Sequence, residues 1–184
     1  MVRVVLFSIW VLLIITIFTV GTIAQDNDFK YVGAKNCKMC HSSKKSGEAF
    51  KIWEASAHAK AYLTLASEES KAIAKKMGID DPQKSDKCLS CHITGHGQAA
   101  TKFEKTFVLE EGVSCEACHG AGSAYNPMKI MKQIKAGEVK GTDFGLIEPT
   151  EANCKTCHNE KSPTFKGFDF KGYSALIAHP TPKE

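Results

Sequence analysis

Apolar residues of this chain recur at helical spacings in three regions. Between Phe50 and Leu65 apolar or small side chains lie three and four residues apart, which predicts two helices or one broken helix over 46–76. The pair Asn126-Pro127 is typical of a helix start, and Gly137 of a helix end. A short helix is expected over 173–178, stopping before Pro180.

Alternating patterns that would indicate strands are nearly absent, and only short pieces such as 107–109 qualify. The predicted fold class is therefore mainly α, with few or no strands. No repeat, low-complexity segment or second fold-sized unit is evident, so one domain is expected.

The N-terminus follows a different pattern, with an unbroken apolar run over 4–20 behind a single positive residue, Arg3. Small residues come next, and the chain turns polar at Gln25. This order is typical of a secretory signal peptide covering 1–24. The run is also about long enough to span a bilayer, so an uncleaved anchor is the alternative. Either interpretation places the domain 25–184 outside the cytoplasm, in the periplasm or at the cell surface.

Composition restricts the function classes. The chain has 184 residues and a formal net charge of +4, and its lysines are scattered rather than clustered. Nucleic-acid binding therefore receives no support from charge. Contact with a membrane is expected only through the N-terminal segment, if it stays uncleaved.

All eight cysteines belong to four Cys-x-x-Cys-His motifs. The motifs read CKMCH, CLSCH, CEACH and CKTCH, with the cysteine pairs Cys37/Cys40, Cys88/Cys91, Cys115/Cys118 and Cys154/Cys157, followed by His41, His92, His119 and His158. Two thiols at this spacing form thioethers with the haem vinyl groups, and the adjacent imidazole binds the iron. The motifs therefore predict four covalently attached c-type haems.

Zinc binding and disulfide formation are the alternatives for any single Cys-x-x-Cys pair. Neither explains why a histidine follows the second cysteine in all four copies. Four haems in about 160 mature residues leave little chain for a side-chain core, so the porphyrins are expected to form much of the interior. The predicted fold is thus small and haem-cored.

Three histidines lie outside the motifs: His58, His96 and His179. Small residues around His58 would let a porphyrin approach, and apolar residues precede His179, so both are predicted as iron ligands. His96 lies too close to His92 to reach the far side of the same haem. It could bind another iron, contact a propionate or pack.

Seven histidines cannot fill the eight axial positions of four irons. At least one iron therefore takes another atom, a residue of another subunit or nothing. Met128 and Met131 share a helical face and are further candidates, although such a stripe is more often core.

The motifs, together with their flanking residues, resemble those of the tetrahaem cytochrome c-554 family. The shared features are Trp53 with the SxHAKA stretch, then CLSCHITGHG, GVSCEACHGAGS and a fourth motif with a late histidine. The resemblance covers essentially the whole mature chain.

The resemblance implies particular ligand pairs. His58 would lie opposite His119 on the third haem, and His179 opposite His158 on the fourth. The second haem, on His92, would have an open iron. The family's partner for the first haem is a histidine shortly after the third motif, and this chain has none there. Met128, Met131 or His96 is left to serve the iron on His41.

The sequence therefore predicts a multihaem cytochrome that carries electrons between redox proteins. One alternative is a haem enzyme that reduces nitric oxide, nitrite or hydroxylamine at an open iron. Another is a subunit of a conductive filament, since a ligand donated by self-association would supply the missing eighth position.

Overall fold

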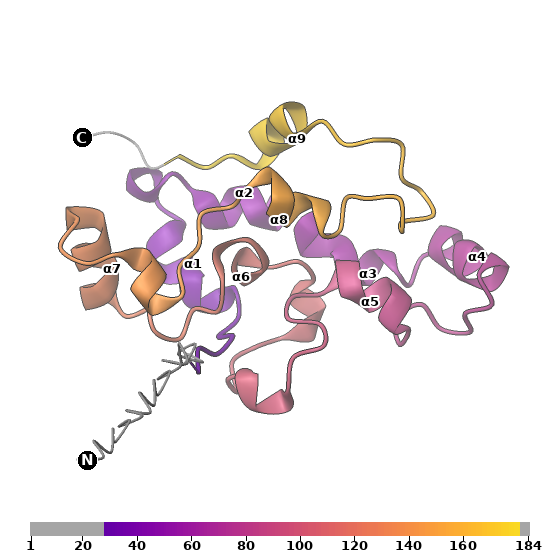
Figure 1. Ribbon diagram of the computed structural model, residues 1–184, viewed down its shortest axis with the longest axis horizontal. Helices are drawn as coiled ribbons and strands as arrows, with labels where there is room; N and C mark the ends of the chain where they lie inside the picture. Colours follow the sequence, from indigo (N-terminus) through magenta and orange to yellow (C-terminus); the bar gives the residue numbers. More distant parts are fainter. Residues whose placement is uncertain (1–27, 181–184) are drawn as a thin grey trace, which may run out of the picture.

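The computed structural model describes residues 28–180, and this part of the chain is mainly helical (Figure 1). Its α-helices are α1 (Lys35–His41), α2 (Ala49–Ala55), α3 (Ala61–Thr64), α4 (Glu68–Lys76), α5 (Asp86–His92), α6 (Cys115–His119), α7 (Met128–Ala136), α8 (Glu151–Lys155) and α9 (Phe170–Ile177). Its 3₁₀ turns are η1 (Lys44–Ser46), η2 (His58–Lys60), η3 (Ala100–Lys102), η4 (Leu109–Glu111) and η5 (Gly141–Phe144). The predicted fold class, mainly α, is confirmed.

Strand pairing in the described residues is limited to one isolated bridge between Tyr31 and Phe103. The short strand predicted over 107–109 does not form, because no extended segment pairs with it and the chain enters η4 at Leu109. The predicted signal segment, 1–24, lies outside the described residues. Within 28–180, no helix is both long enough and apolar enough to cross a membrane.

The helical region predicted over 46–76 is broken, as expected, into α2, η2, α3 and α4. The first break comes at Ser56, whose extended backbone ends α2, and the last at Ser67, whose hydroxyl accepts a hydrogen bond from Ser70 N–H and caps α4. Phe50 and Leu65, at the two ends of the predicted apolar stripe, are both buried. The two ends of the stripe therefore pack inward, whereas Ala57 between them is exposed.

Two other helices differ slightly from prediction at their starts. Helix α7 begins at Met128 rather than at Pro127, because the backbone of Pro127 is still extended (ψ 131°). Gly137 ends α7 in the left-handed conformation, as predicted. Helix α9 begins earlier than expected because the carboxylate of Asp169 caps it. The carboxylate accepts hydrogen bonds from the N–H groups of Lys171 and Gly172, at 3.1 and 3.2 Å.

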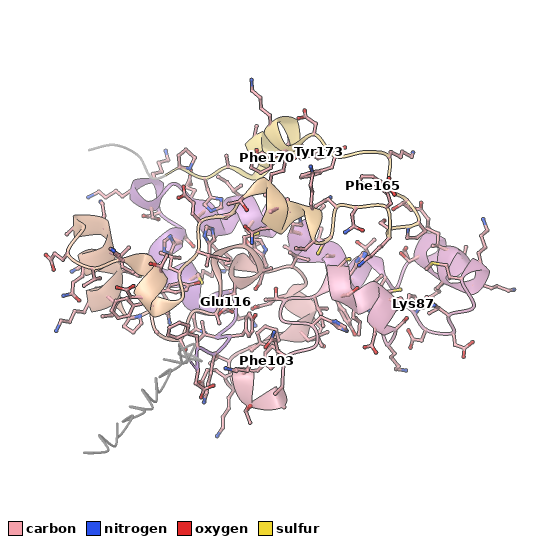
Figure 2. All side chains as sticks on the ribbon, viewed as in Figure 1. Lys87, Phe103, Glu116, Phe165, Phe170 and Tyr173 are labelled. Atoms are coloured by element: carbon pink, nitrogen blue, oxygen red, sulfur yellow. The ribbon has the colours of Figure 1, made fainter. Side chains whose placement is uncertain are left out.

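A buried carboxylate ties the start of the described chain to α6. Glu116 is only 2% exposed and lies in the interior (Figure 2). Its Oε1 accepts hydrogen bonds from the N–H groups of Val32 and Gly122, at 2.8 and 2.7 Å, and its Oε2 accepts one from Gly33 at 2.8 Å. Glu111 adds a parallel contact by accepting from Ala34 N–H at 2.7 Å. These bonds fix α1, which begins directly after this segment, against α6.

Few apolar side chains are buried in the described residues. They are Val32, Ala34, Phe50, Leu65, Ala74 and Tyr125. So small a core cannot by itself offset the conformational entropy of ordering about 150 residues. The polypeptide alone therefore leaves the interior incomplete, as a haem-cored fold requires.

Replacing Glu116 with glutamine tests the importance of the buried carboxylate. In Glu116→Gln an amide –NH₂ replaces one acceptor oxygen and faces a backbone N–H, so at least one hydrogen bond is lost in a dry site. We expect the free energy of unfolding to fall by about 1–3 kcal/mol. Thermal or denaturant unfolding of the purified protein measures this.

The matched control is Glu110→Gln, a change at an exposed carboxylate on η4 close to the same network. It should leave the unfolding midpoint unchanged. Equal destabilisation by the two variants would show that the buried hydrogen bonds of Glu116 are not what stabilises the fold.

Candidate functional site: four motif helices and a shared cavity

Each of the four motifs begins on its own short helix. The first is carried by α1, the second by α5 and the third by α6, whereas the fourth begins on α8 and continues past its end to Cys157 and His158. None of the eight cysteines forms a disulfide. Within residues 28–180 the structure contains no group of three or more His, Cys, Asp or Glu side chains that could hold a metal ion. Each motif thus supplies two thiols and one imidazole.

Buried hydroxyls position α6, which lies near the middle of the molecule (Figure 1). Thr94 Oγ1 accepts from Ser114 N–H at 2.7 Å and donates to the carbonyl of Gly112 at 3.0 Å. Both hydroxyl residues are 2% exposed. Thr94 follows the second motif closely, so this contact also connects α5 to the start of α6.

The first and third motifs meet at their leading cysteines. The two thiols are close enough to interact, and this interaction lowers the pKa of Cys37 and raises the pKa of Cys115. Burial further raises the pKa of Cys115. Both effects belong to the free thiols and disappear once the sulfurs form thioethers. The contact shows that these motifs are neighbours, although they lie far apart in sequence.

The fourth motif lies between the third and the second. The charge of Cys154 contributes, after burial, to raising the pKa of the Cys118 thiol. Burial raises the pKa of Cys157, with Cys91 also contributing, and Cys157 Sγ lies 3.9 Å from the carbonyl oxygen of Ser90. The spatial order of the motifs is therefore first, third, fourth, second. We call this order the motif series.

A cavity of about 340 Å³ separates α1, α2 and α6. It is lined by Cys37, His41, Ser46, Ala49, Phe50, Trp53, Ser56, His58, Val113, Ser114, Cys115, Cys118, His119, Tyr125, Met131, Leu146, Ile177 and His179. The first and third motifs thus face one mostly apolar space. Two of the predicted ligands outside the motifs, His58 and His179, face the same space.

Cys40 differs from the other seven predicted attachment cysteines. Its side chain is exposed, whereas the other seven are partly buried, and it does not line the cavity that Cys37 of the same motif lines. The physical reason is its place in the last turn of α1, a helix without buried residues, where the adjacent Met39 is 88% exposed. The structure therefore does not bring Cys40 to the cavity. Thioether attachment at Cys40 rests on the motif spacing alone and stays a prediction.

Backbone contacts hold His58 in place. Its carbonyl accepts a hydrogen bond from Val113 N–H at 3.0 Å, and Val113 in turn accepts one from the indole N–H of Trp53 at 2.8 Å. A Cβ on Gly112 would lie 2.8 Å from the His58 carbonyl oxygen, so glycine is needed for this approach. The imidazole of His58 lies 5.9 Å from that of His158, measured between ring centroids.

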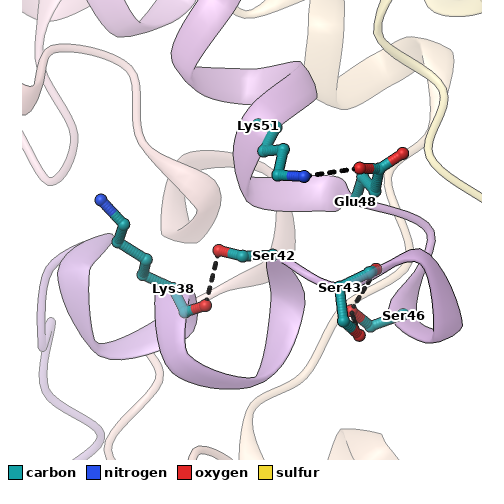
Figure 3. Close-up of polar contacts among 6 residues, drawn as sticks. All are labelled: Lys38, Ser42, Ser43, Ser46, Glu48 and Lys51. Atoms are coloured by element: carbon teal, nitrogen blue, oxygen red, sulfur yellow. Dashed lines mark hydrogen bonds and ion pairs between the residues drawn. The ribbon is translucent and has the colours of Figure 1, made fainter.

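The turn after the first motif receives the C-terminal segment. This turn is closed by polar contacts, including Ser42 Oγ to the carbonyl of Lys38 at 2.7 Å (Figure 3). A Cβ on Gly47 would lie 2.6 Å from the carbonyl oxygen of Pro180 and 3.0 Å from that of His179. The close approach places the imidazole of His179 at 5.9 Å from that of His119.

These two pairs differ from those that the family resemblance implies. The structure places His58 beside His158 and His179 beside His119, whereas the resemblance implied His58 with His119 and His179 with His158. The physical reason is the course of the C-terminal segment. Because Gly47 holds the His179–Pro180 backbone beside the first motif, His179 reaches α6 rather than the fourth motif. The rings of Phe168 and Tyr173 stack at His158 instead, at 4.7 and 6.4 Å.

Backbone carbonyls determine which ring nitrogen is free in three of the histidines. Nδ1 lies 2.7 Å from the Ala61 oxygen in His92, 3.4 Å from the Ile147 oxygen in His119 and 2.8 Å from the Ile177 oxygen in His179. A carbonyl only accepts, so Nδ1 carries the proton and Nε2 keeps a lone pair for a metal.

Burial favours the neutral form of several of these imidazoles. It lowers the pKa of His58, and the charge of His158 adds to this effect. Burial likewise lowers the pKa of His41 and of His119, with His179 contributing to both. A neutral imidazole is the form that binds iron. The lowered pKa values therefore favour the protonation state that an iron ligand needs.

The structure treats the three remaining ligand candidates, His96, Met128 and Met131, differently. His96 directs its Nε2 to the carboxylate of Asp86 at 3.1 Å, on the surface and away from the cavity. The side chain of Met128 is 61% exposed and does not line the cavity, whereas Met131 does. The structure thus brings Met131 to the site and leaves the other two outside it.

The described side chains fit haem as the bound group. A separation of 5.9 Å between ring centroids leaves room for one iron between the two imidazoles of each pair, given metal–nitrogen bonds of about 2 Å. Thioether attachment needs two thiols about one helical turn apart, with an imidazole directly after the second, and each motif supplies them. The mostly apolar cavity suits a porphyrin face.

Sequence reasoning missed three residues that position the site. Glu116 occupies a position inside the third motif that haem attachment leaves free, and only its burial shows its importance. Gly47 and Gly112 act through close approaches to the backbone of His179 and His58. No sequence signal distinguishes these glycines from those in ordinary turns.

Comparison with known proteins agrees with this site. Residues 36–120 match the family described as Cytochrome c554 and c-prime. The chain is 28% identical to cytochrome c-554 from Nitrosomonas europaea over 171 residues, which cover 85% of this chain and 67% of that protein. It is 30% identical over 78 residues to the C-type polyheme cytochrome OmcC from Geobacter sulfurreducens, which covers 39% of this chain but only 9% of OmcC.

No solved structure matches the chain. The matched region 36–120 begins one residue before the first motif cysteine and ends one residue after the third motif histidine, so it contains three of the four motifs and His58. Both the motifs and the relatives point to covalently bound haem. The family match over 36–120 and the similarity to cytochrome c-554 over most of the chain support a multihaem c-type cytochrome of the c-554 family.

Proposed function

We propose that this chain is a tetrahaem electron carrier that works outside the cytoplasm, in the periplasm or at the cell surface, between redox proteins. When bound, each haem supplies an iron that takes up and releases one electron. The observation that carries the proposal is the motif series, in which cysteines of successive motifs lie close together from one end to the other. Groups attached there come close enough for electrons to pass along the molecule.

The chain itself orders and tunes this series. The histidines of the motifs, His41, His92, His119 and His158, are proposed as the ligands on one side of the irons. His58 and His179 are proposed as the opposite ligands, His58 with His158 and His179 with His119, because each ring pair leaves room for one iron. Paired imidazoles give a low reduction potential.

The haem count is tested directly. Protein purified from a host competent in cytochrome maturation should contain four haems by pyridine haemochrome assay, and its mass should exceed that of the polypeptide by four porphyrins. The eight thiols, the exposed Cys40 included, should be unreactive toward alkylating agents, because thioethers have replaced them. Fewer haems, or reactive cysteines in any motif, would contradict the proposal.

The proposed ligand pairs are tested by His58→Ala and His179→Ala. Each variant should convert one low-spin haem to high spin in the electron paramagnetic resonance spectrum of the oxidised protein. The reason is that each removes one of two axial imidazoles. His96→Ala is the matched control and should leave the spectrum unchanged, because its Nε2 is bound to Asp86. A change in the control, or none in the other two variants, would rule out this ligand set.

A second candidate function follows from the surroundings of His92. In the described residues His96, the nearest histidine in sequence, is held by Asp86, and no ring contact joins another imidazole to His92. The proposed iron at His92 would then be open to a small ligand. An enzyme reducing nitric oxide, nitrite or hydroxylamine is the candidate that this favours.

Nitric oxide distinguishes the carrier from the enzyme. Added to the reduced protein, it should bind one haem and be consumed in the enzyme, whereas a pure carrier should release it unchanged. Spectra and the concentration of nitric oxide over repeated additions measure this. Consumption with turnover would replace the carrier proposal by the enzymatic one.

A further inference from the structure

Among the described residues no ring contact joins another imidazole to His41, although His179 lines the same cavity. His58 lies with His158 and His179 with His119, while His96 is bound to Asp86. With the proposed pairs, no histidine outside the motifs is left for the iron on His41. The second axial position opposite His41 must therefore come from another kind of side chain or stay open.

In the described part of the chain, one sulfur outside the motifs faces the space next to His41. Met131 lies in the first half of α7 and lines the cavity together with His41 and Cys37. Its neighbour one turn earlier, Met128, projects outward and is 61% exposed. Helix α7 is fixed at its end by the left-handed Gly137, whose N–H closes the last turn. The fold thus separates two methionines that the sequence presents as equivalent.

The hydroxyl groups lining the cavity are already used. Ser46, Ser56 and Tyr125 donate to the carbonyls of Ser43, Trp53 and Gly120 at 2.9, 2.6 and 2.8 Å, and Ser114 is bound to Thr94. A thioether has no such competing bond, because methionine sulfur is a weak hydrogen-bond acceptor. Among the non-motif side chains of the cavity, Met131 is the soft donor that remains available.

We propose that the thioether sulfur of Met131 is the axial ligand opposite His41 on the haem of the first motif. The inference rests on the proposed tetrahaem function and deepens it. Methionine in place of histidine raises the reduction potential of a haem. The first motif would then be the high-potential end of the motif series, and electrons would collect there.

The position of the first motif suits such a terminal role. It lies at one end of the motif series, and Met39, between its two cysteines, is 88% exposed. A redox partner can therefore approach the edge of this motif. An electron entering at the second motif, at the opposite end, would move toward a more favourable site.

The test uses the near-infrared charge-transfer band that ferric haem shows when methionine is an axial ligand. Oxidised wild-type protein carrying four haems should show this band with the intensity of one haem. Met131→Leu should abolish the band while the pyridine haemochrome count stays at four. Leucine preserves the apolar volume, so the helix should still pack.

Met128→Leu is the matched control, one turn away on the same helix, and should keep the band at full intensity. Met131→His adds a gain-of-ligand test that does not depend on a loss. It should replace the band by the spectrum of a low-spin haem with two imidazoles. In a redox titration one haem of the four should shift to a lower potential.

The outcomes separate this inference from the function on which it rests. Four haems without a methionine band in the wild-type protein, or a band that survives Met131→Leu, would overturn the ligand assignment alone. The first of these results would also be expected if His179 bound the iron on His41. A wild-type protein without haem would instead overturn the proposed function itself.

Discussion

The carboxylate of Glu116 holds together the part of the molecule on which the rest of the site depends. It is buried, and burial raises its pKa even though three backbone N–H groups bind it and act in the opposite direction. These bonds fix the segment before α1 to α6. Because α1 and α6 carry the first and third motifs, the same bonds bring Cys37 to Cys115 and enclose the cavity between them. Hydrogen bonds to a buried carboxylate thus hold together helices that a larger side-chain core holds together in larger domains.

The histidines show how backbone geometry selects chemistry. In three rings the Nδ1–H donates a hydrogen bond to a carbonyl oxygen, which leaves Nε2 available to a metal, whereas the Nε2 of His96 is bound to Asp86. The same residue type therefore serves as a proposed ligand in one place and as a surface ion-pair partner in another. The difference lies in which atoms surround each ring and not in the sequence next to it.

Unequal ligands would give direction to a chain of otherwise similar centres. Two imidazoles favour a low potential, a thioether a higher one, and an open position permits binding of a small molecule. The described residues offer all three surroundings: paired rings at His119 and His158, Met131 on the cavity that His41 also lines, and a ring without an imidazole contact at His92. The motif series orders these surroundings, with the methionine at one end and the open site at the other.

Local sequence patterns were enough to predict covalent haem attachment and a mainly α fold. Cys-x-x-Cys-His spacing acts within one helical turn, and apolar spacing of three and four is likewise local, so both follow from neighbouring residues alone. Three other features needed contacts in three dimensions. They are the order of the motifs, the proposed partners of His58 and His179, and the preference for Met131 over Met128. Each depends on contacts between residues distant in the chain, such as Glu116 with Val32 and Gly47 with His179. A local sequence pattern cannot predict such contacts, because it involves residues that are neighbours in sequence and not residues that are neighbours in space.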